Sequence, residues 1–143
     1  GAEVTAISSS PDKEQEARQF GASHFITPDQ LGAYTGAFDL ILVATSAHED
    51  WSPYFETLRP FGKLCFLTLD YNPLTISPKQ MLPQQKEIVG SAYASPKVTA
   101  EMLDFAAEHN IRPQIEVIPM AEINAAFKKL GRGEARYRLV LEV

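Results

Sequence analysis

The stretch of residues 38–44 constrains the fold of this 143-residue chain more than any other. Its sequence is Phe-Asp-Leu-Ile-Leu-Val-Ala, a nearly continuous apolar run that is typical of a central parallel strand buried on both faces. Shorter apolar runs alternate along the chain with polar segments of helical pattern. This alternation predicts an α/β fold in which helices cover a parallel sheet.

The predicted elements follow one another closely. Residues 11–20 are expected to form an amphipathic helix, with Ser10 as its cap, Pro11 in its first turn and Gly21 at its end. The other predicted helices cover residues 51–58, 97–110 and 121–130. The predicted strands cover residues 4–7, 24–26, 38–44, 62–69, 86–92, 114–118 and 137–143. A turn is expected at residues 60–62, and a loop with a single helical turn at residues 71–83.

Charge and cysteine content exclude several kinds of partner. The net charge of -5 and the absence of any Lys/Arg run argue against nucleic acid and membrane surfaces. No apolar stretch reaches the roughly 18 residues of a membrane span. Cys65 is the only cysteine, which excludes an intramolecular disulfide and favours a reducing, cytoplasmic setting. Because a strand pattern begins at once, without an initiator Met, we expect the sequence to be a fragment.

A serine cluster and a lysine stand where the first predicted strand gives way to a helix. In dinucleotide-binding folds this position contacts the adenosine ribose: a carboxylate accepts from a free 2'-hydroxyl, whereas hydroxyl and cationic groups accommodate a 2'-phosphate. The residues here are Ser8, Ser9, Ser10 and Lys13, which offer donors to a phosphate and so favour NADP(H). On this segment alone, a capped helix with a solvated lysine is the simpler explanation.

Two further segments follow predicted strands. Thr45 and Ser46 could bond the ribose or pyrophosphate of a cofactor, or could cap a turn. Ser91, Ala92 and Tyr93 could form a wall beside a nicotinamide ring, and tight strand packing explains the small residues equally well.

Other chemistry-bearing side chains have simpler explanations. His24, His48 and His109 are expected on the surface or in loops, and Cys65 in the core as a small apolar side chain. No Gly-x-Gly-x-x-Gly phosphate loop is present. In a doubly wound fold this loop precedes the strand with which the chain begins. We therefore expect a Rossmann-like, doubly wound parallel sheet that lacks its first strand and its Gly-rich loop.

Taken together, the segments resemble the C-terminal half of zinc-type medium-chain dehydrogenases, in the branch of cinnamyl alcohol dehydrogenases and NADPH-dependent aldehyde reductases. The similarity extends over essentially the whole chain, and the Ile-Asn-x-Ala helix followed by Arg-Tyr-Arg is specific in combination. The segments that carry it are residues 1–10 with Lys13, 20–22, 50–64, 90–91, 102–106, 109–111, 123–126 and 136–140.

The resemblance implies hydride transfer between NADP(H) and an alcohol or aldehyde, with a zinc ion polarising the carbonyl oxygen. It implies that Ser9, Ser10 and Lys13 contact the 2'-phosphate, that Thr45 contacts the cofactor, and that residues 91–94 lie beside the nicotinamide. In this family the zinc ligands and the proton relay lie in the N-terminal half. We therefore expect no catalytic residue and no metal ligand in this chain, which alone should be inactive.

The resemblance also predicts the domain organisation. Residues 1–112 are expected to form a partial NADP-binding Rossmann domain, and residues 113–143 a strand-helix-strand segment that returns to the catalytic domain. A homodimer is expected.

Residues 67–70 depart from the family, whose members usually have a glycine after this strand, and Asp70 would alter a contact near the nicotinamide.

Two other functions share much of this pattern. A stand-alone Rossmann-like module with a binding or dimerisation role and no catalysis fits the same segments. An S-adenosylmethionine-dependent methyltransferase also alternates strands and helices, but it usually carries an acidic residue at the end of its second strand. Ser8 and Ser9 at that position argue against it.

Overall fold

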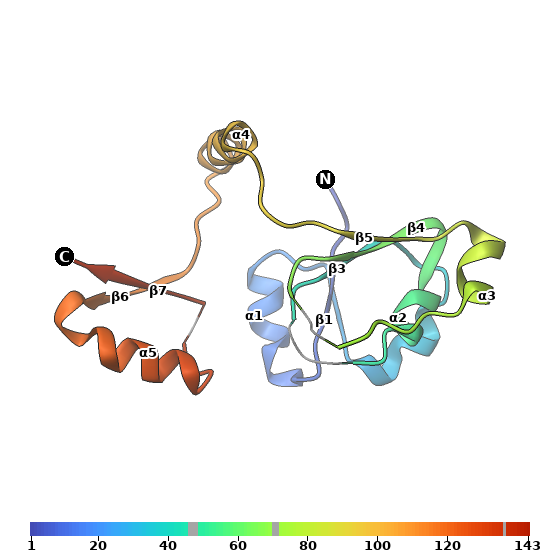
Figure 1. Ribbon diagram of the computed structural model, residues 1–143, viewed down its shortest axis with the longest axis horizontal. Helices are drawn as coiled ribbons and strands as arrows, with labels where there is room; N and C mark the ends of the chain where they lie inside the picture. Colours follow the sequence, from blue (N-terminus) through green and yellow to red (C-terminus); the bar gives the residue numbers. More distant parts are fainter. Residues whose placement is uncertain (46–48, 70–71, 136) are drawn as a thin grey trace. The chain divides into compact units, whose positions relative to one another are not determined.

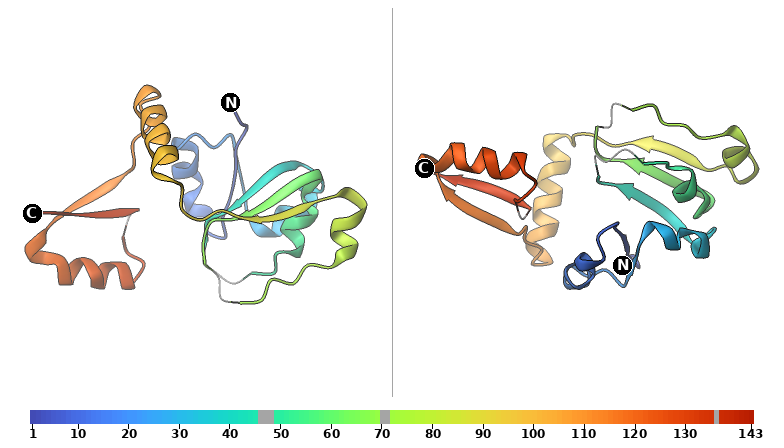
Figure 2. Two further views of the ribbon diagram at one scale, coloured as in Figure 1. Left: turned by 45° about the horizontal axis from the view of Figure 1, so that its top comes forward. Right: turned by 90° about the horizontal axis from the view of Figure 1, so that it is seen from below.

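The computed structural model describes residues 1–45, 49–69, 72–135 and 137–143 (Figures 1 and 2). It consists of two compact units, Gly1–Ala92 and Tyr93–Val143, each of which is described by itself. Every strand pairing among these residues is parallel, which confirms the predicted α/β class. No helix in the described ranges has the length and apolar character that a membrane crossing requires. The predicted domain boundary after residue 112 stays a prediction.

The first unit holds two parallel sheets. β1 pairs with β2, and β3, β4 and β5 form a second sheet in that order. Its elements, in chain order, are β1 (Thr5–Ile7), η1 (Pro11–Lys13), α1 (Glu14–Gln19), β2 (His24–Ile26), η2 (Pro28–Tyr34), β3 (Phe38–Val43), α2 (Ser52–Glu56), β4 (Leu58–Phe66), α3 (Pro78–Met81), η3 (Leu82–Gln84) and β5 (Glu87–Gly90). The 3-10 helix η2 was not predicted.

The core of this unit lies between the sheets and the helices α2 and η2. Phe55, Leu58 and Leu64 are completely buried, and the side chains of Ile41 and Val43 on β3 point into the same cluster. Alternate residues of a strand face opposite sides of the sheet, so the remaining leucines of β3 point away from this core.

The prediction that β3 is buried on both faces is wrong for this unit. Leu40 is 50% exposed and Leu42 is 57% exposed. The apolar run still produced a strand, because β-branched and other large apolar residues favour extended backbone. Helices α2 and η2 both pack against the face of β3 that carries Ile41 and Val43, and the core of the described residues lies on that face.

An irregularity in β4 replaces the predicted turn at residues 60–62. Phe38 pairs with Leu58 but Leu40 pairs with Lys63, so β4 carries extra residues opposite β3. Phe61 adopts a positive φ of 62° within this bulge. A Cβ on Gly62 would lie 2.8 Å from the carbonyl oxygen of Arg59, so the bulge closes tightly over a position that only glycine fits. β4 consequently begins before the predicted strand.

The second unit begins with a helix and ends with a β-α-β segment. Its elements are α4 (Pro96–Glu108), β6 (Ile115–Pro119), η4 (Met120–Glu122), α5 (Ile123–Gly131) and β7 (Arg138–Glu142). β6 and β7 pair in parallel, and α5 covers one face of the pair, where Ile118 and Ala126 are buried. The strand-helix-strand predicted for residues 113–143 is therefore present.

Candidate functional site

The candidate site lies at the carboxyl ends of the strands in the first unit. Parallel pairing places these ends along one edge of each sheet, which is where ligands bind in open α/β folds. Hydrogen bonds continue past the strand ends: the Leu67 amide donates to the Val43 carbonyl at 3.0 Å, and the Ser91 amide donates to the Phe66 carbonyl at 2.9 Å. The loops that follow β3, β4 and β5 are thus held together where they leave the sheet.

The serine segment follows β1 directly. The Ser8 amide donates to the Ile26 carbonyl at 3.2 Å, which anchors the segment to the end of β2. Ile7, the last residue of β1, packs against the same core cluster as Val43 of β3. The two sheets of this unit therefore share one core, and the residues that follow β1 and β3 both extend beyond it.

The predicted cap on the first helix is wrong in one respect. Ser10 occupies the capping position, but its side chain makes no capping hydrogen bond. The turn is closed instead by the Ser10 amide, which donates to Ser8 Oγ at 3.2 Å, and by the Lys13 amide, which donates to the Ser10 carbonyl at 3.1 Å. Ser8 Oγ thus accepts the hydrogen bond that closes the turn. The hydroxyls of Ser9 and Ser10 have no partner among the described residues.

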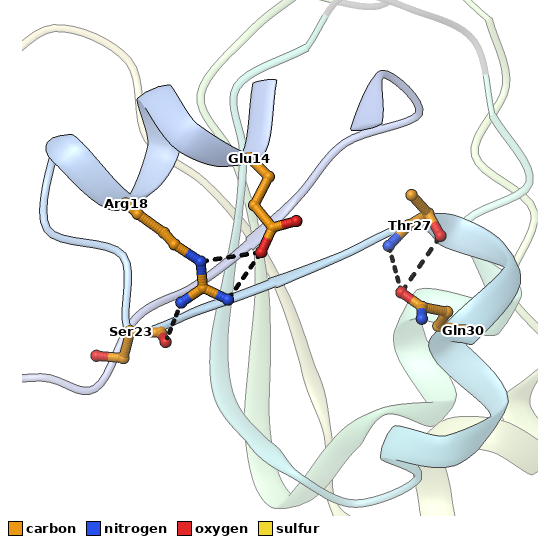
Figure 3. A network of polar contacts seen from close by, with 5 residues as sticks. All are labelled: Glu14, Arg18, Ser23, Thr27 and Gln30. Carbon is orange, nitrogen blue, oxygen red and sulfur yellow. Dashed lines mark hydrogen bonds and ion pairs between the residues drawn. The ribbon is translucent and has the colours of Figure 1, made fainter. Parts of the chain in front are cut away.

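The ammonium of Lys13 is exposed and forms no ion pair within the described ranges. The following carboxylate, Glu14, is engaged by Arg18, whose Nε lies 2.9 Å from Glu14 Oε1 and whose Nη1 donates to the Ser23 carbonyl at 3.0 Å (Figure 3). Asp12 is exposed, so water and salt screen its charge. Lys13 thus remains available for an external anion.

The other predicted cofactor residues are placed differently. Thr45 follows β3, and its carbonyl accepts a hydrogen bond from the Thr68 hydroxyl at 2.7 Å. Ser91 and Ala92 follow β5 at the same edge of the sheet and are exposed. Tyr93 belongs to the second unit, where it is fully exposed. Ser46 lies outside the described residues, as do His48, Asp70 and Arg136.

The remaining histidines and the cysteine take the simpler roles that were predicted. His24 pairs with Glu3 at 2.7 Å on the surface, and the ring of His109 lies 4.2 Å from that of Phe105. Cys65 is a free, buried thiol.

Tyr54 is buried in the core. This burial, together with the hydrogen bond to Glu49 and the charge of Glu49, raises the pKa of the Tyr54 hydroxyl above its usual value.

The donor set at the carboxyl edge consists of hydroxyls, main-chain amides and one ammonium. Such groups suit a phosphate and sugar ligand, because all of them donate to anionic or hydroxyl oxygens. In the part of the chain that the structure describes, no group of three or more His, Cys, Asp or Glu residues could hold a metal ion. The donors at this edge therefore suit a phosphorylated nucleotide such as a nicotinamide cofactor.

Thr68 also lies at this edge but was not predicted as a site residue. It follows β4 in the same way that Thr45 follows β3, and this shared position at a strand end is the signal that could have identified it. The predicted departure at residues 67–70 concerned Asp70 instead.

The chain is similar to proteins of known family. A family model described as zinc-binding dehydrogenase matches residues 1–108. A probable formaldehyde dehydrogenase, AdhA, from Bacillus subtilis (strain 168) is 38% identical over 146 residues, which cover 100% of this chain and 42% of that protein. This chain thus spans about two fifths of the length of such relatives.

Solved structures show the same similarity. A cinnamyl alcohol dehydrogenase from Sorghum bicolor superposes with a TM-score of 0.88 at 31% identity, over 97% of this chain and 40% of that one. A cinnamyl alcohol dehydrogenase from Helicobacter pylori, solved in complex with NADP(H), superposes with a TM-score of 0.82 at 29% identity, over 99% of this chain and 41% of that one.

Proposed function

This chain belongs to the zinc-binding dehydrogenase family, and on that premise we propose that it is the cofactor-binding part of an oxidoreductase that transfers hydride between NADP(H) and an alcohol or aldehyde. The chain spans about two fifths of its relatives, so the activity and the substrate belong to the intact protein. A cytoplasmic homodimer is part of the same proposal, with the outer edge of β5 as the pairing surface.

One observation carries the choice of NADP(H). Ser9, Ser10 and Lys13 follow β1 with side chains that have no partner among the described residues, and no carboxylate stands at the end of that strand. Two hydroxyls and an ammonium can donate to the oxygens of a 2'-phosphate. A free 2'-hydroxyl would find no acidic acceptor at the same position. The NADP(H) complex of the Helicobacter pylori relative supports this assignment.

The proposed tasks of this chain are binding and orientation. The serine segment and Lys13 would hold the adenosine end, and Thr45, Ser91 and Ala92 would contact the cofactor further along the carboxyl edge. When bound, NADPH supplies the hydride. In the intact enzyme a zinc ion would polarise the substrate carbonyl, and its ligands would come from outside the residues described here.

The choice of cofactor is tested by comparing adenosine 2',5'-bisphosphate with adenosine 5'-monophosphate in calorimetric titrations. We expect the 2'-phosphorylated probe to bind more tightly. Lys13→Ala should remove about 1.5–3 kcal/mol of that advantage, which is the contribution of one charged hydrogen bond. Ser9→Asp should reverse the preference, because its carboxylate repels the phosphate and accepts from a free hydroxyl.

Lys79→Ala is the matched control, since Lys79 is an exposed lysine of the same unit that lies on α3. It should leave both affinities unchanged. Equal binding of the two probes, with no change in Lys13→Ala or Ser9→Asp, would show that the serine segment only forms a turn and that the cofactor assignment is wrong.

A further inference from the structure

Two carboxylates flank the lysine that would meet the 2'-phosphate of the cofactor. Asp12 precedes Lys13 and Glu14 follows it. Consecutive Cα atoms lie only about 3.8 Å apart, so both carboxylates lie near the proposed phosphate site, where salt screens a charge only over roughly 8–10 Å. A carboxylate at this range opposes the binding of a phosphate dianion. A cation that offsets one of the two should therefore strengthen phosphate binding.

Arg18 is such a cation, and it pairs with Glu14. It stands one turn further along α1, and both its Nε and its Nη2 lie 2.9 Å from Glu14 Oε1 (Figure 3). Two nitrogens on one carboxylate oxygen form a charge-assisted contact. Glu14 is thus a flanking carboxylate whose charge the fold compensates.

The other contact of Arg18 lies away from the phosphate site. Its Nη1 donates to the Ser23 carbonyl at 3.0 Å, and the Ser23 amide donates to the Val4 carbonyl at 2.8 Å. Val4 and Ser23 directly precede β1 and β2, so this anchor lies at the amino ends of the two parallel strands. The serine segment follows β1 at the opposite, carboxyl end. The contacts of Arg18 therefore favour an action through Glu14 over a direct contact with the phosphate.

We infer that Arg18 helps to determine the preference for a 2'-phosphorylated cofactor, because it neutralises the carboxylate that follows Lys13. The inference rests on the proposed function and adds a positioning residue to the proposed site. The side chains of Arg18 and Glu14 are 49% and 48% exposed, so water screens the pair and its effect is modest. The effect concerns the 2'-phosphate most, since that group would lie beside Lys13.

The test is a double-mutant cycle in the intact protein, with adenosine 2',5'-bisphosphate and adenosine 5'-monophosphate as probes in calorimetric titrations. Arg18→Met leaves the Glu14 carboxylate without its cation. It should raise the Kd of the bisphosphate about 2- to 5-fold, as expected for one screened charge near a dianion. The Kd of the monophosphate should stay nearly the same. In a Glu14→Gln background, Arg18→Met should have no effect on either probe, because no carboxylate remains to be neutralised.

The cycle separates this role from two others. If Arg18 contacted the phosphate directly, Arg18→Met would weaken bisphosphate binding equally with and without the Glu14 carboxylate. If Arg18 only anchored α1 through the Ser23 carbonyl, the loss would again be the same in both backgrounds. Equal losses would therefore overturn the inference.

Lys63→Met is the matched control, because it removes the cation of a similarly exposed ion pair of the same unit, with Glu87 at 2.8 Å. It should leave both Kd values unchanged, and a loss as large as that of Arg18→Met would overturn the inference. If the wild type binds the two probes equally, the proposed choice of NADP(H) is overturned and this inference with it. If the wild type prefers the bisphosphate and Arg18→Met keeps that preference in full, the inference about Arg18 alone is overturned.

Discussion

Tyr54 places a hydroxyl in the hydrophobic core, and Glu49 accepts its hydrogen bond. Burial is the largest cause of the raised pKa, and the bond and the charge of Glu49 act in the same direction. An ionised tyrosine would lose its donor and would face the carboxylate, so the folded state strongly favours the neutral phenol.

This preference predicts a loss of stability at high pH. In the unfolded chain Tyr54 ionises at its usual pKa of 10.0, whereas in the folded chain it stays protonated above that value. The free energy of unfolding should therefore be unaffected below pH 10 and should fall above it, by at most about 1.4 kcal/mol per pH unit. Urea unfolding between pH 9 and pH 11 measures this slope.

Tyr54→Phe should make the slope shallower, because phenylalanine has no proton to lose. Tyr93→Phe is the control, since Tyr93 is fully exposed. An unchanged slope in Tyr54→Phe would mean that other groups cause the alkaline loss.

Single residues also show where sequence reasoning reaches its limit. The position of the serine segment after β1 follows from the strand pattern alone, and the structure contains the strand and the helix that this position requires. The roles within the segment do not follow from the pattern. Ser8, rather than Ser10, closes the turn, because the backbone brings its Oγ within 3.2 Å of the Ser10 amide. The contact from Thr68 to Thr45 joins two loops and has no local signature.

At the scale of elements, the bulge of β4 leaves no room for a side chain at Gly62. A methyl group there would meet the Arg59 carbonyl oxygen at 2.8 Å and Leu58 Cβ at 3.0 Å, and Leu58 is completely buried. Gly62→Ala should therefore lower the free energy of unfolding by about 1–3 kcal/mol, the range for overpacking. Urea unfolding gives the value.

Gly32→Ala provides the comparison, because nothing lies within 4 Å of the position its Cβ would take. It should leave stability unchanged or increase it by less than about 1 kcal/mol, since alanine restricts the unfolded chain. Equal effects of the two substitutions would show that the bulge can relax around a side chain.

A buried lysine just before β5 contacts the end of α2. Lys86 is 5% exposed, and its Nζ donates to the Phe55 carbonyl at 3.0 Å, near the negative end of the helix dipole. Lys86→Met should lower the free energy of unfolding by about 1–3 kcal/mol, because a buried carbonyl loses its charged donor. Lys63→Met removes an exposed ion pair with Glu87 and should cost less than about 1 kcal/mol. The reverse order, in thermal or urea unfolding, would contradict this assignment.

Element types proved easier to predict than burial. Every predicted strand is present, because apolar runs of strand length between turn residues are a local signal. The helix η2 was missed, since its residues include Pro28 and Gly32, which are typical of loops. It forms because Thr27 and Gln30 make a capping box (Figure 3) and because Leu31 is anchored in the core. The burial of Leu31 and the one-sided burial of β3 both depend on tertiary contacts, which the local sequence pattern does not show.

At the scale of the whole chain, the two units differ in how much apolar surface they bury. Ten of the described core residues belong to the first unit, from Ile26 to Cys65, whereas Ile118 and Ala126 are the buried apolar residues described in the second. Amide hydrogen exchange should therefore be slowest in β3 and β4, and β6 and β7 should exchange faster, since local stability follows buried contacts. Mass spectrometry of exchanged peptides measures both. Equal protection in the two units would contradict the prediction.

The uniformly parallel pairing has a consequence for folding kinetics. None of the strand pairs described here can begin as a hairpin, because each parallel pair needs a crossover, and the partners in each pairing are separated by roughly 20 residues. The loop-closure entropy is then nearly the same for each pair, since it grows only with the logarithm of loop length. Sequence separation gives none of them an early advantage. Burial decides instead, and β3 with β4, which bring Ile41, Val43 and Leu64 together, should form the nucleus on which the other pairings of the first unit assemble.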